Sequence, residues 1–303
     1  MPSPFRTWLQ LFRAPNLFTV PGDPLAGYIL AAYGAFESDV FYAVGASVCF
    51  YAAGLLDNDL ADLREDRAER PNRPLPSGAA NPRTVAFVAA ALVCLGFLLA
   101  GKLGPPALAV AAALVAAVGI YNHLTKHIPV IGALNMGACR GLSLMLGAAA
   151  APHNDLLWRL CVTGKLTPLL TACGLVTLYV AAITHLARFE TRAQSPPLAK
   201  WLPAAAALGG AAFFLGQVWS TTLWSTGAIF CIVVMNAFGV ALHLTRNPSA
   251  PVPPVIGQLL RLLLLVQTAF CAAVGTVEAS LCAALLLIAW PISRAVSKRF
   301  YAS

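Results

Sequence analysis

Long apolar segments follow one another along this chain, separated by short polar connections. Each holds roughly twenty residues, the length that an α-helix needs to cross the hydrocarbon core of a membrane. The apolar positions run on without the alternation that marks the strands of a membrane barrel. We therefore expect an all-α, polytopic membrane bundle of nine to ten transmembrane helices. The expected segments are 17–35, 39–56, 83–101, 105–122, 129–151, 166–187, 200–217, 222–244, 256–275 and 278–296.

Two of these segments contain residues that complicate the count. Pro21, Gly22 and Pro24 break the first segment and leave Asp23 within the membrane. The 256–275 segment carries Arg261, so it either crosses the membrane or lies along its surface, which gives ten or nine crossings. The first fifteen residues resemble a short amphipathic lead-in without a signal-peptide cleavage site. No long polar region exists, so we expect one transmembrane domain over residues 1–303.

Composition supports a membrane protein. The chain is 59% hydrophobic and 11% charged, whereas a soluble domain carries about 25% charged residues. The net charge of +8 follows from a one-sided distribution of basic residues, so it indicates membrane orientation and no nucleic-acid partner. With a cytoplasmic N-terminus, the outer side would hold only Lys102, Arg159 and Lys165. The cytoplasmic side would hold Arg6, Arg13, Arg64, Arg67, Arg70, Arg73, Arg83, Lys126, Arg188, Arg192, Lys200, Arg246, Arg294, Lys298 and Arg299.

Acidic residues concentrate in one place, just after the second apolar segment. Six of the twelve acidic residues lie at positions 57–69. On a helix, Asp59, Asp62 and Asp66 would line one face. Carboxylates crowded in this way repel one another unless a cation joins them, and Mg²⁺ prefers such oxygen ligands. The alternative is a solvated loop whose acids pair with the interleaved arginines, although such surface pairs contribute only about 0–1 kcal/mol each.

A proline-rich turn follows this acidic stretch, over residues 70–78. Its prolines prevent the helix from continuing and fix a rigid turn. Arg73 presents a planar fork of donors that suits phosphate oxygens; it could instead face anionic lipid headgroups. Together with the acidic stretch, this turn predicts a metal and diphosphate site at the membrane edge.

These motifs resemble the first aspartate-rich motif of the UbiA superfamily of intramembrane prenyltransferases. The resemblance rests on the following residues: Asn58-Asp59-x-x-Asp62-x-x-x-Asp66, then Arg73-Pro74-Leu-Pro76-Ser-Gly78, the opening Pro15-Asn16 to Pro24 segment, Tyr121-x-x-x-x-Lys126, and the glycines Gly132, Gly137 and Gly141. It covers most of the chain and is strongest over residues 13–150.

The resemblance implies a helical bundle whose central cavity holds an isoprenoid diphosphate among apolar helices open sideways to lipid. It implies Mg²⁺-dependent transfer of the prenyl group to a lipophilic or aromatic acceptor. Asp59, Asp62 and Asp66 would be the catalytic metal ligands. The remaining residues would form the substrate site: Asn58 would shape it, Arg73 and Lys126 would grip the diphosphate, and Tyr121 would line the pocket.

The sixth segment departs from the family pattern. The family carries a second aspartate-rich motif there, but residues 179–192 contain no aspartate. Glu190 could be one metal ligand, and His185 and Arg188 share a helix face, so that Arg188 could hold phosphate directly. The alternative is a non-catalytic binding or transport component with a degenerate second motif.

This version of the sixth segment looks most like the UbiA-like EboC group of the bacterial ebo gene cluster. That narrower likeness implies a role in a membrane-associated metabolite pathway, and we expect the protein in the bacterial plasma membrane. The distribution of basic residues predicts that the active-site loops are cytoplasmic.

Arg140 is a basic residue in the middle of an apolar segment. Because burying it is costly, it should face the bundle interior and meet a partner. Asp23 is the natural candidate, and a contact with substrate is the alternative. The glycines of the same segment predict close helix packing or room for a substrate. The eight scattered cysteines are expected to be small buried hydrophobes with no metal or disulfide role.

Overall fold

The computed structural model describes residues 4–152, 168–190, 195–218 and 222–299, and within these ranges every regular element is a helix. Nine helical segments of this described part are long and apolar enough to cross a membrane. They are α4 (Asp39–Ala61), α6 (Pro82–Gly101), α7 with η1 (Pro105–Ile120 and Tyr121–Thr125), α8 (Pro129–Ala149), α10 (Pro168–Ala187), α11 (Pro197–Leu215), α12 (Leu223–Arg246), α13 with α14 (Val252–Arg261 and Leu263–Ala272) and α15 (Val277–Arg299). The expected all-α polytopic bundle is confirmed.

The first apolar segment is interrupted, as its prolines predict. It consists of α2 (Ala14–Leu17), a turn, and α3 (Gly22–Ala31), preceded by α1 (Pro4–Leu11). Because α3 has only ten residues, it is too short to cross alone, which explains why nine long helices accompany ten expected segments. The 256–275 segment with Arg261 belongs to the long apolar pair α13–α14.

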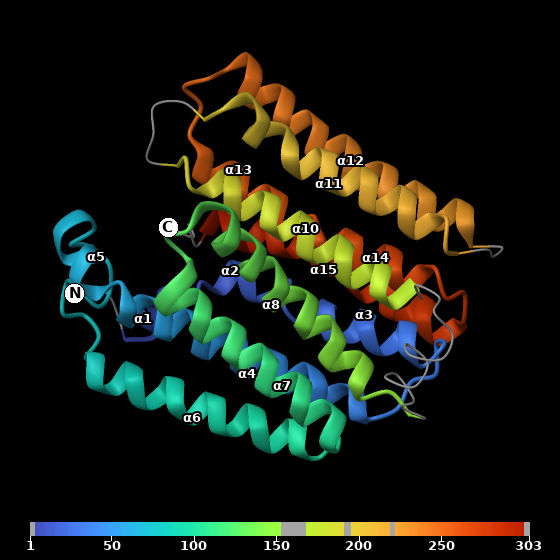
Figure 1. Ribbon diagram of the computed structural model, residues 1–303, viewed down its shortest axis with the longest axis horizontal. Coiled ribbons are helices and arrows are strands. Elements are labelled where there is room, and N and C mark those ends of the chain that lie inside the picture. The colour runs from blue at the N-terminus through green and yellow to red at the C-terminus, as the bar shows by residue number, and fades with distance from the viewer. Residues whose placement is uncertain (1–3, 153–167, 191–194, 219–221, 300–303) are drawn as a thin grey trace.

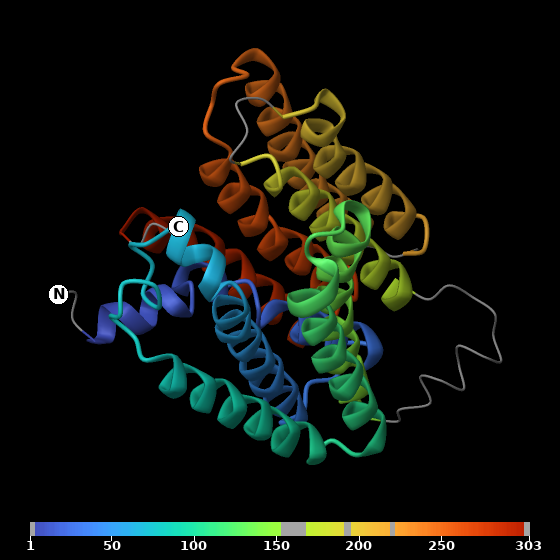
Figure 2. The ribbon, with the colours of Figure 1, turned by 60° about the vertical axis from the view of Figure 1, so that its left-hand side comes forward.

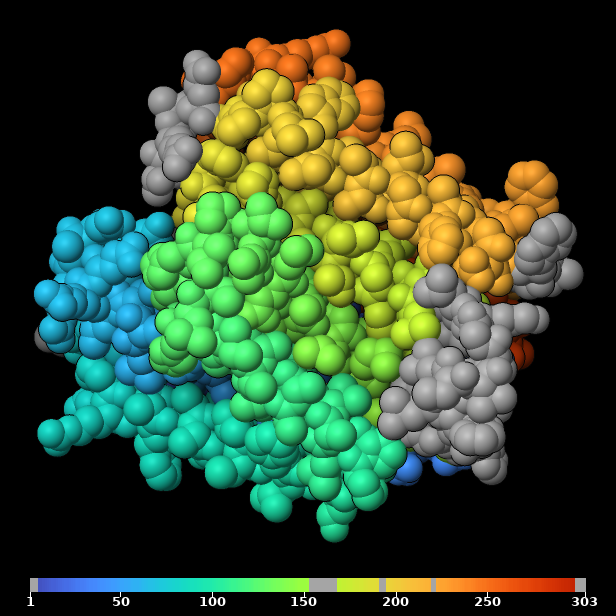
Figure 3. All heavy atoms as spheres, viewed as in Figure 1, coloured from blue at the N-terminus to red at the C-terminus, as the bar shows by residue number. Residues whose placement is uncertain are grey.

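The helices run side by side along the longest axis of the molecule (Figure 1). Helix α1 and the short helix α5 (Leu63–Glu69) lie toward one end in both ribbon views (Figures 1 and 2). The space-filling view shows the α11–α12 hairpin on one side of the bundle, with α6 and α7 on the opposite side (Figure 3). The acidic stretch therefore lies toward the same end as α1. Arg159, Lys165 and Arg192 lie outside the described residues.

Glycines on α8 allow its neighbours to approach closely. A Cβ at Gly137 would clash with the backbone carbonyl of Thr177 on α10, and one at Gly147 would clash with the carbonyl of Pro24 on α3. Gly141 faces the Thr177 side chain in the same way. The prediction of close packing is confirmed at these positions. Helix α8 therefore packs closely against both α10 and α3.

Candidate active site

The acidic stretch spans two helices. Helix α4 ends at Ala61, Asp62 occupies the junction, and α5 begins at Leu63. Asp59 therefore sits on the last turn of α4, whereas Asp66 lies on α5. The single continuous helix expected from the spacing is wrong here. Helices in proteins owe most of their stability to packing against neighbours. We attribute the end of α4 at Ala61 to the loss of such packing where the chain leaves the apolar bundle.

Each of the three aspartates forms an ion pair with a different cation. Asp59 accepts from Arg13 at 3.1 Å, and Asp62 pairs with Lys126. Asp66 accepts from Nη1 of Arg73 through both carboxylate oxygens, at 2.8 and 3.1 Å. The aspartate side chains are 13%, 21% and 6% exposed in chain order. They are thus turned into the structure and not splayed toward solvent.

The three cations come from three separate elements. Arg13 precedes α2 in a left-handed conformation, with φ 45°. Arg73 lies in the proline-rich turn, whose backbone closes through the Ser77 N–H to the Arg73 carbonyl at 3.0 Å. Lys126 follows the π-helical turn η1, a type of turn that is frequent at functional sites. Burial lowers the pKa of Lys126, and the Asp57 carboxylate partly opposes this effect.

An amide network lies beside these ion pairs. Asn58 donates to Asn122 at 3.3 Å, and Asn122 donates to Asp57 at 2.7 Å and to the Gly54 carbonyl at 3.1 Å. Asp57 also contacts His123 at 3.2 Å. The predicted site residue Asn58 is therefore fixed by η1, and Asn122 and Asp57 join the site although no motif pointed to them.

The end of α10 meets the same loops. Arg188 donates to the His127 carbonyl at 3.1 Å, and Glu190 accepts from Arg70 at 3.2 Å in an exposed pair. The His185 ring packs edge-on against Phe189 at 5.6 Å. Hence Arg188 and Glu190 contact the loops around the site, His185 packs within its own segment, and no contact joins any of the three to the three aspartates.

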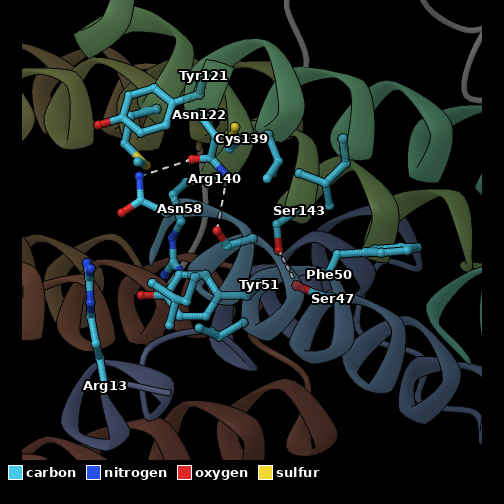
Figure 4. A pocket seen from close by; sticks show the side chains of 16 residues that line it. Arg13, Ser47, Phe50, Tyr51, Asn58, Tyr121, Asn122, Cys139, Arg140 and Ser143 are labelled. Atoms are coloured by element: carbon cyan, nitrogen blue, oxygen red, sulfur yellow. Dashed lines mark hydrogen bonds between the residues drawn. The ribbon is translucent and has the colours of Figure 1, made fainter. Parts of the chain in front are cut away.

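A cavity of about 140 Å³ opens between α4, α7, η1 and α8 (Figure 4). Asn58, Tyr121, Arg140 and Arg13 line it. The first three were predicted from the sequence as site residues, whereas Arg13 was not. Arg13 lies two residues before the Pro15-Asn16 motif, and this proximity could have identified it as a candidate. Asp59, Asp62, Asp66, Arg73 and Lys126 do not line the cavity. The link to the cavity runs through Asp59, which follows Asn58 in the chain and pairs with the lining residue Arg13.

Arg140 both lines this cavity and forms a buried ion pair. Its Nε lies 2.7 Å from Oδ2 of Asp23, and its Nη2 donates to the Thr19 carbonyl at 2.8 Å. Gln267 of α14 donates to the same carbonyl at 2.9 Å and to Asp23 at 2.6 Å. The predicted Asp23–Arg140 pair is confirmed. It fastens the interrupted α2–α3 segment to α8 and α14.

The donor set suits Mg²⁺ by its chemistry, because residues 57–66 and Asn122 offer carboxylate and amide oxygens. No three Asp, Glu, His or Cys side chains of the described ranges converge closely enough to hold a metal ion. Each of the three aspartates is instead paired with its own cation. Those cations are groups that bind phosphate oxygens equally well, so a diphosphate would compete for them and release the carboxylates.

Comparison with known proteins gives the family. The model of the UbiA prenyltransferase family matches residues 24–252, which make up most of the chain and run from α3 to the start of α13. The chain belongs to the UbiA prenyltransferase family.

Curated relatives and solved structures agree with this assignment. Digeranylgeranylglyceryl phosphate synthase of Metallosphaera sedula is 28% identical over 165 residues, which cover 54% of this chain and 58% of the relative. The synthase of Methanopyrus kandleri is 33% identical over 149 residues, covering 48% and 53%. The chain thus spans between half and three fifths of the length of these relatives.

Two solved structures share the fold. The apo UbiA homolog from Aeropyrum pernix K1 has a TM-score of 0.68 and 20% identity, and the alignment covers 84% of this chain and 96% of that one. The UbiA homolog from Archaeoglobus fulgidus bound to DMAPP and Mg²⁺ has a TM-score of 0.64 and 11% identity, with 89% and 100% covered. At these identities the likeness shows the fold of this UbiA family member.

Proposed function

We propose that this protein transfers a prenyl group from an isoprenoid diphosphate to a lipophilic or aromatic acceptor, with Mg²⁺ as cofactor. The observation that carries the proposal is the set of three aspartate–cation pairs, one of which includes the cavity-lining residue Arg13. These pairs supply carboxylates for a metal and cations for a diphosphate, and the largely apolar cavity supplies space for a tail. Family relatives named as synthases, and homologs bound to DMAPP or GPP with Mg²⁺, support it.

The chain's own residues would divide the work as follows. Arg73, Lys126 and Arg13 would leave their aspartates and donate to the diphosphate oxygens. Asp59 and Asp62, with Asp66, would hold the metal. Bound Mg²⁺ would supply positive charge that stabilises the departing diphosphate.

The remaining residues shape the space for the tail. Asn58, held by Asn122, would fix the position of the diphosphate above the cavity. Tyr51, Tyr121 and Arg140 line the space below it, where the apolar walls exclude water from the reactive carbon.

A second candidate function follows from the end of α10. Arg188 and Glu190 contact loop carbonyls and Arg70 instead of the site, so no second carboxylate cluster faces the first within the described residues. The absence of a second carboxylate cluster among the described residues is consistent with a binding or transport component that keeps the cavity but catalyses no reaction. The narrower likeness to the EboC group, in a membrane-associated metabolite pathway at the bacterial plasma membrane with cytoplasmic active-site loops, stays a prediction.

Turnover separates the two functions. Purified protein in lipid nanodiscs is given geranyl diphosphate, Mg²⁺, a membrane lipid extract and a panel of aromatic acceptors, and pyrophosphate release is measured. A prenyltransferase releases pyrophosphate, and Asp59→Ala or Asp62→Ala abolishes the release. Tight Mg²⁺-dependent binding of geranyl diphosphate without any acceptor-dependent release would favour the binding component.

A further inference from the structure

The cavity beside Asn58 continues along α4, away from the acidic stretch. Its lining positions on this helix share one face: Ser47, Phe50, Tyr51, Gly54, Leu55 and Asn58. Ser47 and Asn58 are separated by roughly 16 Å along the helix axis, at about 1.5 Å per residue. Helix α8 lines the other side with Met136, Cys139, Arg140 and Ser143. The cavity is therefore a narrow slot that runs from the polar end toward the middle of the bundle (Figure 4).

Three side chains line the far end of this slot. The hydroxyls of Ser47 and Ser143 are 2.6 Å apart and join α4 to α8 in a buried hydrogen bond. The Phe50 ring lies beside them, only 2% exposed, and packs edge-on against Phe97 at 5.3 Å. The backbone of Gly96 is so close to this ring that a Cβ there would clash with it. Phe50 is thus held in place from behind.

Small residues lie beyond Phe50. The apolar cluster that contains it includes Ala46 of α4, Ala100 of α6, and Ala107 and Ala111 of α7, all buried. The same cluster also contains Leu114 and Leu146. Phe50 belongs both to the lining of the slot and to this cluster, so removing its ring would leave space between the two.

We propose that Phe50 and the Ser47–Ser143 pair end the tail site and select short isoprenoid chains. This inference rests on the proposed function, since it names the substrate class of the same site. The slot of about 140 Å³ is well below the roughly 300–1,000 Å³ of typical ligand pockets. A dimethylallyl or geranyl tail ends before the stop, whereas a geranylgeranyl tail meets the Phe50 ring and the serine pair.

The test compares binding of unreactive thiolodiphosphate analogues with dimethylallyl, geranyl and geranylgeranyl tails. The full chain is placed in lipid nanodiscs with Mg²⁺. Each variant is compared with the wild type for the same analogue, so that the partitioning of long tails into lipid affects both measurements equally. Phe50→Ala is expected to raise the affinity for the geranylgeranyl analogue relative to the geranyl analogue by about tenfold or more. Phe41→Ala, at an exposed phenylalanine of the same helix, should leave the ratio unchanged.

A second variant keeps the test decisive if Phe50→Ala does not fold. Ser143→Leu fills the far end, so it should weaken the geranyl analogue relative to the dimethylallyl analogue by about tenfold. A folded Phe50→Ala protein with the wild-type ratio, or a Ser143→Leu protein with no change, overturns the chain-length stop while the diphosphate site stands. If no analogue binds the wild type, the proposed function itself fails.

Discussion

The Arg140 guanidinium lies 2.7 Å from the Asp23 carboxylate, across the interface between α8 and the interrupted first segment. The nearest atoms, Nε of Arg140 and Oδ2 of Asp23, are not aligned as a hydrogen bond, so the attraction between them is chiefly electrostatic. Asp23 is fully buried and Arg140 is 7% exposed. Breaking such a pair leaves one charge unpaired inside the bundle, whereas removing both charges together can be nearly neutral.

Arg140→Met is therefore expected to destabilise the protein by about 3–5 kcal/mol. Asp23→Asn combined with Arg140→Met should recover much of that loss, because no unpaired charge then remains. The measurement is the midpoint of unfolding in mixed detergent micelles. Equal midpoints for the single and double variants would contradict the account of this pair.

Arg13 pairs with Asp59 and lines the cavity, and we propose it as a diphosphate ligand that the motifs did not identify. Arg13→Ala should weaken binding of geranyl diphosphate about tenfold or more, equivalent to roughly 1.5–3 kcal/mol for a hydrogen bond to a charged group. The control is Arg83→Ala, at an exposed arginine at the start of α6. Isothermal titration with Mg²⁺ measures both, and equal affinities would show that Arg13 only anchors α2.

Glu190 is a poor metal ligand in this arrangement. It forms an exposed pair with Arg70, and both side chains are more than a third accessible. Such pairs contribute only about 0–1 kcal/mol. Glu190→Gln is expected to leave Mg²⁺-dependent diphosphate binding within about twofold of the wild type. A loss as large as that of Asp62→Ala would show instead that the end of α10 carries a metal ligand.

Close packing of α8 on α10 requires a glycine at position 137. Gly137→Ala should destabilise the protein by about 1–3 kcal/mol, because the added methyl group overpacks the interface. Gly209→Ala is the matched control: a Cβ there meets nothing within 4 Å, so the gain in helix propensity should make it neutral or stabilising. Thermal unfolding of the two variants gives the comparison, and equal shifts would mean that the helices do not meet as closely as described.

The sequence predicted those features that depend on local pattern. Apolar length located the helices, and the prolines located the interruption before α3. The motif contained both Asp66 and Arg73, which are seven residues apart, but their ion pair was not predicted. The cost of burying Arg140 was enough to point to Asp23, because few other charges lie at the same depth.

Other features depend on packing that no local pattern records. Arg13 and Asp59 are 46 residues apart, and Gln267 lies 244 residues from Asp23. The spacing of the aspartates along the sequence showed which carboxylates are near one another. It did not show with which cation each carboxylate would form an ion pair. Nor did it show that the helix would end at Ala61, since that depends on where the bundle stops supporting it. The position of the Phe50 ring depends likewise on Gly96 and Phe97 of a neighbouring helix.

The central claim is that the aspartates hold a metal which in turn binds the diphosphate of an isoprenoid. Binding of geranyl thiolodiphosphate is measured with Mg²⁺ and with EDTA, for the wild type, Asp62→Asn and the control Glu65→Gln, whose carboxylate is exposed on α5. We predict Mg²⁺-dependent binding that Asp62→Asn abolishes and Glu65→Gln preserves. Binding that is equally tight in EDTA, or that survives Asp62→Asn, would contradict the claim.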